Sequence, residues 1–250
     1  DELVHVEVAD GVRTVTLDSQ HNRNALSRQL VTELVAAVDG AAGDPDTRVV
    51  RLRAVGKAFC AGADLSEAAG ADDAQREANT RGMVAMMRAV VACPAPVVAE
   101  VHAPVRAGGI GLVAACDLAV AGSSATFSLT EVKLALTPAV ISLTVLPRLT
   151  DRAASRTFLT GELFDGHRAA EIGLVTEAVA DEALVPHVDA LVAELAAHPA
   201  QGLTETKRLL AAPLLARLDA GEDEMVALSS RLFGSEAAQQ AMLAFLSRGR

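Results

Sequence analysis

The stretch RAGGIGLVAACDLAV, residues 106–120, places three glycines in one turn between apolar runs. It follows the apolar segment VVAEV at 97–101 and ends in LAVAG at 118–122, a pattern that predicts a strand, a glycine turn, a short helix and another strand. Gly108 and Gly109 at the start of such a helix leave backbone N–H groups without partners at the positive end of the helix dipole. Such a turn can bind an anion or an oxygen that gains charge during a reaction, or it can simply permit tight packing of helix on strand.

Strand and helix patterns also alternate before the glycine turn. LVHVEVADGVRTVTLDS, residues 3–19, alternates apolar and polar side chains around Asp10-Gly11, which predicts a β-hairpin with a primed turn. Ser27 is a suitable N-cap for one helix, and a second helix is expected over residues 74–92. This alternation predicts an α/β fold.

The C-terminal part of the chain has a different pattern. Strands and helices alternate as far as GLVTEAV at 173–179, and the remaining residues show helical patterns only. We therefore place a boundary near residue 190, between an α/β core over residues 1–190 and a helical segment over residues 191–250.

Composition excludes several classes of function. The chain is 51% hydrophobic but only 2% aromatic, so aliphatic side chains must pack the core, and its formal net charge of −10 disfavours a nucleic-acid partner. No apolar segment reaches the length of a membrane span and no signal peptide is visible, so we expect a cytoplasmic protein with no membrane partner. The cysteines lie far apart without metal-ligand spacing, so we expect no metal site and three buried apolar thiols: Cys60, Cys93 and Cys116.

A second glycine turn makes a binding role more specific. GKAFCAGADL, residues 56–65, follows the expected strand RVVRLRAV at 48–55, just as the first glycine turn follows its own strand. Loops at the ends of two strands can each donate one N–H to the same carbonyl oxygen, which predicts an oxyanion hole. The chain has neither a G-x-G-x-x-G dinucleotide pattern near a first strand nor a G-x-S-x-G nucleophile turn.

Five sequence blocks occur in the order and spacing of the crotonase (enoyl-CoA hydratase/isomerase) superfamily, which the chain resembles over residues 3–180. The blocks are RNALS, GKAFCAGADL, PVVAEVHAPVRAGGIGLVAACDLAVA, FSLTEVKLALTP and FLTGELFDGHRAAEIGLVTEAV. The resemblance implies a crotonase-like spiral of ββα units with a C-terminal helical oligomerisation segment, assembled as a homotrimer or a dimer of trimers. It also implies an acyl-CoA thioester as substrate, with no other cofactor.

The same resemblance assigns the oxyanion hole and the CoA contacts. The N–H groups of Ala63 and Gly108 are expected to hold the thioester oxygen, and one such donor contributes about 3 kcal/mol as the enolate forms. Arg23 could equally be a solvated surface residue, and Asp64 could instead cap its loop. The resemblance implies that the Arg23 side chain meets a phosphate of CoA and that four residues contact CoA through their backbone. The residues expected to contact CoA or the acyl group are Arg23, Ala25, Ala61, Asp64, Leu65 and Gly111.

Acid–base chemistry is expected from Glu131 in the block SLTEVKL. Hydratases of the family commonly use two glutamates, and Gly111 occupies the position of the other one. Glu131 alone can accept a proton from water and return it to the α-carbon, so hydration of an enoyl-CoA is the expected reaction, with Δ3,Δ2-enoyl-CoA isomerisation as the alternative. Burial in an apolar pocket would raise its pKa. From the residues alone, a surface glutamate paired with Lys133 or Lys207 is the competing interpretation.

Further interpretations stay open at this point. The missing second glutamate also suits a homologue that binds acyl-CoA without chemistry, and a cofactor-free decarboxylase or hydrolase is a third possibility. The blocks around Gly111 and Glu131 look most similar to a bacterial branch of methylglutaconyl-CoA and related branched enoyl-CoA hydratases. AVIS at 139–142 replaces the usual glycine-rich segment and HAP at 102–104 replaces Asn-Gly, which alters the expected pocket.

Two further expectations concern structure. His102 is expected to be a structural residue at a strand end rather than a second base. The C-terminal helices are expected to bury an apolar face against sister chains. The candidate interface leucines are Leu203, Leu209, Leu210, Leu214 and Leu215.

Overall fold

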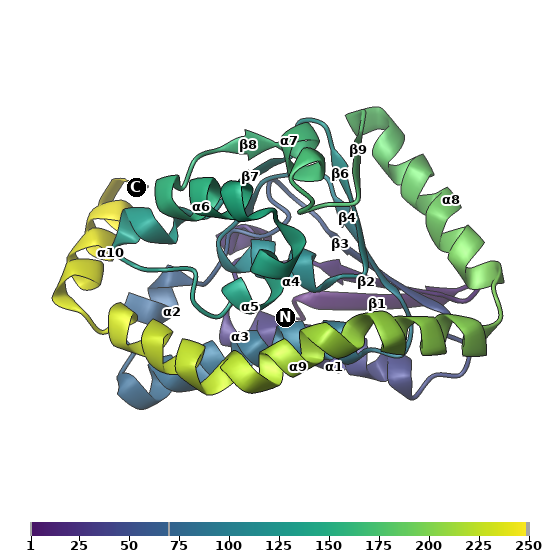
Figure 1. Ribbon diagram of the computed structural model, residues 1–250, viewed down its shortest axis with the longest axis horizontal. Coiled ribbons are helices and arrows are strands. Elements are labelled where there is room, and N and C mark those ends of the chain that lie inside the picture. Colours follow the sequence, from purple (N-terminus) through teal and green to yellow (C-terminus); the bar gives the residue numbers. More distant parts are fainter. Residues whose placement is uncertain (1, 70, 249–250) are drawn as a thin grey trace.

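Two β-sheets organise the chain in the computed structural model, which describes residues 2–69 and 71–248 (Figure 1). The larger sheet has the order β1-β2-β3-β4-β6-β9, with β1 and β2 antiparallel and the other neighbours parallel. The smaller sheet has the order β5-β7-β8. The strands are β1 (Val4–Ala9), β2 (Val12–Leu17), β3 (Val49–Ala54), β4 (Val97–Val101), β5 (Val105–Arg106), β6 (Leu118–Gly122), β7 (Thr126–Ser128), β8 (Phe164–Asp165) and β9 (Glu177–Val179).

Helices connect and cover these strands, so the expected α/β fold is confirmed. The α-helices are α1 (Arg28–Ala42), α2 (Leu65–Ala69), α3 (Asp73–Ala92), α4 (Gly108–Ala115), α5 (Ser142–Val145), α6 (Asp151–Thr160), α7 (Gly166–Glu171), α8 (Leu184–Ala197), α9 (Ala200–Phe233) and α10 (Glu236–Arg248). The 3₁₀ turns are η1 (Gln20–Asn22), η2 (Thr130–Leu134), η3 (Leu146–Arg148) and η4 (Asp181–Ala183).

The local signals at the N-terminus act as expected. Asp10 and Gly11 have positive φ angles of 51° and 81°, as a primed hairpin turn requires, and they join the antiparallel strands β1 and β2. Ser27 caps α1, because its side-chain oxygen accepts a hydrogen bond from the Leu30 N–H at 3.2 Å. Both sequence predictions are confirmed.

Helix α8 covers one face of the larger sheet (Figure 1). Val98 and Val120 on the strands pack against Leu184 and Val188 on α8. The boundary expected near residue 190 therefore falls inside a helix that packs on the sheet. The sequence suggests a boundary there because no strand pattern follows residue 179, although an amphipathic helix can complete the same core.

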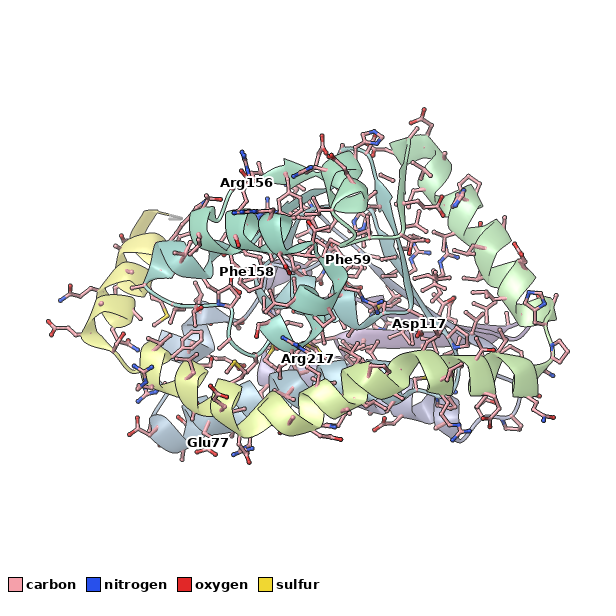
Figure 2. All side chains as sticks on the ribbon, in the orientation of Figure 1. Phe59, Glu77, Asp117, Arg156, Phe158 and Arg217 are labelled. Atoms are coloured by element: carbon pink, nitrogen blue, oxygen red, sulfur yellow. The ribbon has the colours of Figure 1, made fainter. Side chains whose placement is uncertain are left out.

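Helix α9 runs along the length of the molecule, and a buried lysine anchors it (Figure 1). The Lys207 ammonium group donates to the carbonyls of Val90 at 3.0 Å and Ala95 at 2.9 Å and pairs with Asp117 at 2.8 Å. Figure 2 shows Asp117 between the larger sheet and α9. Lys207 therefore has a structural role and holds α9 against the core.

The leucines of α9 divide between the core and the surface. Leu214 and Leu215 are half-buried and pack against the main core of this same chain, and their expected contact with a sister chain stays a prediction. Leu209 and Leu210 are 74% and 70% exposed, and Leu203 is half-buried. Of the five candidate leucines, Leu209 and Leu210 are the pair that exposes a large apolar surface.

Candidate active site

Isolated bridges extend the smaller sheet into both glycine-containing loops. Strands β5 and β7 are parallel, with Val105 opposite Phe127. Cys60 forms a parallel bridge with Val105, and Ala63 forms a parallel bridge with Leu26. These segments run side by side in one direction, so the residues that follow their carboxyl ends meet along one edge.

The two expected oxyanion donors lie at this edge. Gly108 is the first residue of α4, so its N–H has no carbonyl partner within the helix. The backbone nitrogen of Ala63 lies 3.6 Å from the position that a Cβ on Gly108 would occupy. Two hydrogen bonds hold the loop around Ala63. The Leu26 N–H donates to Gly62 O at 2.8 Å, and the Ala61 N–H donates to Arg23 O at 3.1 Å, so neither bond uses the Ala63 N–H. The structure thus brings the two amides close together.

A strained residue holds the second turn. Ala107, the N-cap of α4, has φ 46° and ψ −119°, a backbone conformation that alanine rarely adopts. Its N–H donates to Ser128 O at 3.1 Å, and the N–H of Arg106 donates to Cys60 O at 2.9 Å. Sequence reasoning missed Ala107, because nothing in its residue type signals a positive φ angle.

Gly62 is required where the two turns touch. Its φ is 90°, and a Cβ at this position would lie 2.9 Å from Ala107 Cβ and 3.0 Å from Arg106 O. Any side chain here would push the Ala63 loop away from α4. Glycine therefore sets the distance between the two expected donors.

Ends of apolar side chains line the space next to the Gly108 backbone. A Cβ on Gly108 would lie 2.5 Å from Met83 Cε and 3.1 Å from Leu26 Cδ1. These atoms are the ends of flexible side chains, which can move aside for a ligand. A charged oxygen bound at the two amides would lie in apolar surroundings, where hydrogen bonds to it are strengthened.

Glu131 lies in η2, which begins two residues after β7 ends. The residue as a whole is half-buried, but its Oε2 atom is buried and has no hydrogen-bond partner in the described structure. Burial disfavours the charged form and raises the pKa of Glu131 to about 7, although its own backbone N–H partly offsets this effect. The competing interpretation as a surface ion pair is wrong, because Lys207 pairs with Asp117 and Glu131 Oε2 is unpaired.

The turn that carries Glu131 is packed beneath α10. Leu134 and Leu136 belong to a small apolar cluster with Met242 of α10 and Leu65 of α2. Figure 1 shows α10 beside α2 at one end of the molecule. The cluster therefore connects η2, which carries Glu131, to the loop expected to bind CoA.

The expected CoA-binding segments are also joined. Arg23 is exposed and left-handed, with φ 60°, and its carbonyl accepts the hydrogen bond from Ala61. Ala25 is buried, and Leu65 begins α2. An open hollow of about 460 Å³ lies between these loops, with Asn22 among its lining residues. Its size is in the range of small-molecule sites.

Asp64 caps the loop that leads into α2. One of its oxygens accepts from the N–H and the hydroxyl of Ser66, at 2.9 and 2.6 Å, and the other accepts from Asn22 Nδ2 at 3.0 Å. Burial would raise the pKa of Asp64, but these hydrogen bonds outweigh it and hold the pKa below its ordinary value. The loop-capping interpretation of the side chain is confirmed.

Gly111 lies one helical turn after Gly108 and is buried. A Cβ at this position would lie 2.5 Å from Ile141 Cγ2, 2.8 Å from Ile141 Cβ and 3.1 Å from Met87 Sδ. The place expected to face the substrate is thus packed against two apolar side chains.

The remaining polar candidates have structural roles. His102 directly follows β4, and its Nε2 atom lies 2.9 Å from Gly56 O, which confirms the structural role expected of it. All three cysteines are buried and free, and burial raises the pKa of both Cys60 and Cys116 to about 12. Within residues 2–69 and 71–248, no group of three or more His, Cys, Asp or Glu side chains is placed to hold a metal ion, and no helix has the length and apolar character to cross a membrane.

Comparisons with known proteins agree with this arrangement. The family model for enoyl-CoA hydratase/isomerase matches residues 7–250. The crystal structure of an enoyl-CoA hydratase from Mycobacterium avium is similar, with a TM-score of 0.92, 45% identity and coverage of 99% of this chain and 97% of that chain. A Thermus thermophilus protein provisionally named enoyl-CoA hydratase is 36% identical over 211 residues, which cover 83% of each chain.

Proteins with an isomerase name are also among those similar to this chain. The peroxisomal Delta(3,5)-Delta(2,4)-dienoyl-CoA isomerase of Arabidopsis thaliana is 26% identical over 257 residues, with coverage of 97% of this chain and 92% of the relative. Together, the matched residues and the crotonase fold show that the chain belongs to the enoyl-CoA hydratase/isomerase family of the crotonase superfamily.

Proposed function

We propose that the chain hydrates the double bond of an enoyl-CoA thioester and that Glu131 is its only acid–base group. Ala63 and Gly108 donate their N–H groups to the thioester oxygen. The Glu131 carboxylate takes a proton from water while the water oxygen bonds to the β-carbon, and the electrons of the double bond move toward the thioester oxygen. Glu131 then returns the proton to the α-carbon, so one water is added and the carboxylate is regenerated.

The buried, unpaired Oε2 atom of Glu131 carries this proposal. A general acid–base group works best when its pKa is near the working pH, because both protonation states are then available. Burial brings the pKa of Glu131 to about 7, so a single carboxyl can take and return a proton at neutral pH. A paired surface glutamate would keep its proton only in acid.

Electrostatic stabilisation of the enolate supports the same proposal. The Ala63 nitrogen lies 3.6 Å from the Cβ position of Gly108, and the neighbouring atoms Met83 Cε and Leu26 Cδ1 are apolar. In such surroundings, removing one oxyanion donor from an enzyme costs about 3–4 kcal/mol of transition-state stabilisation. The proposal requires no cofactor beyond the CoA thioester itself.

Double-bond isomerisation is the second candidate, and the packing of Gly111 favours it. Ile141 and Met87 occupy the space beside Gly111, so no carboxylate from α4 helps Glu131 to hold a water. An isomerase needs only one group that removes a proton from one substrate carbon and returns it to another. Glu131 can perform that transfer alone.

The test compares wild type with Glu131→Gln on two substrates. Hydration of crotonyl-CoA is followed by the loss of absorbance from the double bond conjugated with the thioester. Isomerisation of a 3-enoyl-CoA is followed by the gain of that absorbance. We expect Glu131→Gln to lower the faster of the two activities by about 10²- to 10⁴-fold, the usual contribution of a positioned acid–base group. A loss below about threefold would show that Glu131 is not the proton carrier. Tight binding of crotonyl-CoA by calorimetry without any turnover would instead favour the non-catalytic acyl-CoA-binding homologue.

The proposal includes a homotrimer or a dimer of trimers. Its support is the family and the exposed pair Leu209 and Leu210 on α9, since a long helix with adjacent exposed leucines suits burial against another chain. Light scattering of the purified protein should give three or six times the monomer mass. A monomer at micromolar concentration contradicts this part alone.

A further inference from the structure

The contact between Gly111 and Ile141 is rigid on both sides. Ile141 Cβ, 2.8 Å from the Cβ position of Gly111, is bonded directly to the backbone, so no rotation of the side chain moves it away. The buried Thr144 hydroxyl lies 3.0 Å from Gly111 O and 3.2 Å from Ile141 O. Thr144 therefore fixes the Ile141 segment against α4.

The three atoms nearest to the Cβ position of Gly111 also offer no strong hydrogen-bond partner to a water. They are carbon atoms of Ile141 and the thioether sulfur of Met87, and the Gly111 carbonyl already has the Thr144 hydroxyl within hydrogen-bonding distance. A buried water needs two to four polar partners and room for about one probe sphere. Neither a carboxylate nor an ordered water fits here without a change at Ile141.

We propose that Ile141 is a specificity-determining residue, which excludes a second acid–base group and its water from the α4 side of the substrate and so limits hydration to what Glu131 alone can do. This inference rests on the proposed function for its chemistry. It makes Ile141 and Gly111 a reciprocal pair: an isoleucine at 141 requires glycine at 111, and a glutamate at 111 requires a small residue at 141.

The packing part of the proposal is tested by stability, without any assay. Gly111→Ala is made in three backgrounds: wild type, Ile141→Gly and Ile141→Val. In wild type we expect the alanine to lower the melting temperature by about 5 °C, because overpacking a rigid core costs stability. Ile141→Gly removes both Cγ2 and Cβ and should abolish this effect. Ile141→Val keeps both atoms and should leave the effect in place.

The specificity part is tested with Gly111→Glu in the Ile141→Gly background, and Gly111→Glu in the Ile141→Val background is the matched control. We expect the first double variant to hydrate crotonyl-CoA at least tenfold faster than Ile141→Gly alone, since a second carboxylate can then position the water. Isomerisation of a 3-enoyl-CoA should not rise with it. The control should stay at or below its parent.

Two results would overturn the inference. One is Gly111→Ala with the melting temperature of wild type, which would show that Ile141 does not fill this space. The other is a folded Gly111→Glu/Ile141→Gly variant that hydrates no faster than its parent. Failure of that variant to fold would also count against the inference, because a glycine at 141 should leave room for the glutamate. A failure of Glu131→Gln to lose activity would count against the proposed function instead, and the stability series would be unaffected by it.

Discussion

Glu100 and Glu131 each have a buried carboxyl oxygen, and the surroundings of the two carboxyls are opposite. Glu100 on β4 is 3% exposed and faces the α8 side of the larger sheet, where it accepts hydrogen bonds from the guanidinium of Arg51, one of them at 2.8 Å. Arg51 in turn donates to Asp189 of α8 at 2.6 Å. Glu131 has one buried oxygen without any partner.

This difference distinguishes Glu100, whose carboxylate stabilises the fold, from Glu131, for which we propose proton transfer. A buried charge is tolerated when an opposite charge and hydrogen bonds replace the lost water, as they do for Glu100. A buried carboxyl without such partners keeps its proton to a higher pH, as Glu131 does with a pKa of about 7. The unpaired carboxyl of Glu131 therefore lowers the stability of the folded protein at neutral pH, and its pKa suits the proton transfer that we propose for it.

Removing the structural carboxylate should give the largest stability effect. Glu100→Gln leaves the Arg51 guanidinium buried with only Asp189 as a charged partner, and breaking a buried pair in this way costs about 3–5 kcal/mol. Urea unfolding monitored by circular dichroism measures the loss. The rate per folded molecule should stay within about threefold of wild type, because Glu100 is on the α8 side of the larger sheet.

Asp189→Asn is the matched control for that prediction. The Asp189 side chain is 56% exposed, so its pair with Arg51 is screened by water and should be worth less than about 1 kcal/mol. Equal losses of unfolding free energy in the two variants would mean that Glu100 stabilises the fold no more than an exposed carboxylate does. The contrast with Glu131 would then disappear.

The pH dependence of stability should show the cost of Glu131. Its pKa rises from an ordinary 4.5 to about 7 on folding, so the folded protein binds this proton more tightly than the unfolded chain. Its contribution to stability is fully present below pH 4.5 and is lost as the pH rises to about 7, a change of about 3 kcal/mol. Glutamine at this position cannot titrate.

The measurement is the difference in unfolding free energy between wild type and Glu131→Gln across pH 4 to 8. Other carboxylates titrate in both proteins and cancel in the difference. We expect the variant to become more stable relative to wild type as the pH rises, with the change complete above pH 7. A difference that stays flat over this range would show that the Glu131 carboxyl is solvated in the folded chain.

Much of this arrangement is predictable from sequence because it depends on local signals. The glycines at 108 and 109 mark the helix start, Ser27 marks α1, and the block around Glu131 singles out the glutamate whose Oε2 is buried and unpaired. The pairing of Arg51 with Glu100 is not predictable in this way, because it joins residues far apart in sequence. It follows from the register of β3 and β4, which no short motif encodes.

The contact of Ile141 with Gly111 shows the same limit. Sequence reasoning noted that position 111 lacks a glutamate and that the segment at 139–142 lacks its usual glycines, but it treated these as separate changes. Only the packing shows that the Ile141 side chain fills the space beside Gly111. The boundary expected near residue 190 lies within α8 for a related reason, since α8 packs on the sheet through contacts that no strand pattern signals.

Asp64 provides an intermediate case with the smallest expected effect. Like Glu131 it is partly buried, but the Ser66 N–H and hydroxyl and the Asn22 amide donate to it, and its pKa is lowered. Asp64→Asn keeps the acceptor for Ser66 but turns an NH₂ group toward the NH₂ of Asn22, so we expect a loss of about 1 kcal/mol in urea unfolding. The KM for crotonyl-CoA should change less than threefold, because the contact with CoA that the family resemblance implies for Asp64 is made by its backbone. A rise of the KM above tenfold would place the Asp64 side chain in the binding site. Hydrogen-bonded and unpaired carboxyls could then no longer be assigned to structural and functional roles on that basis alone.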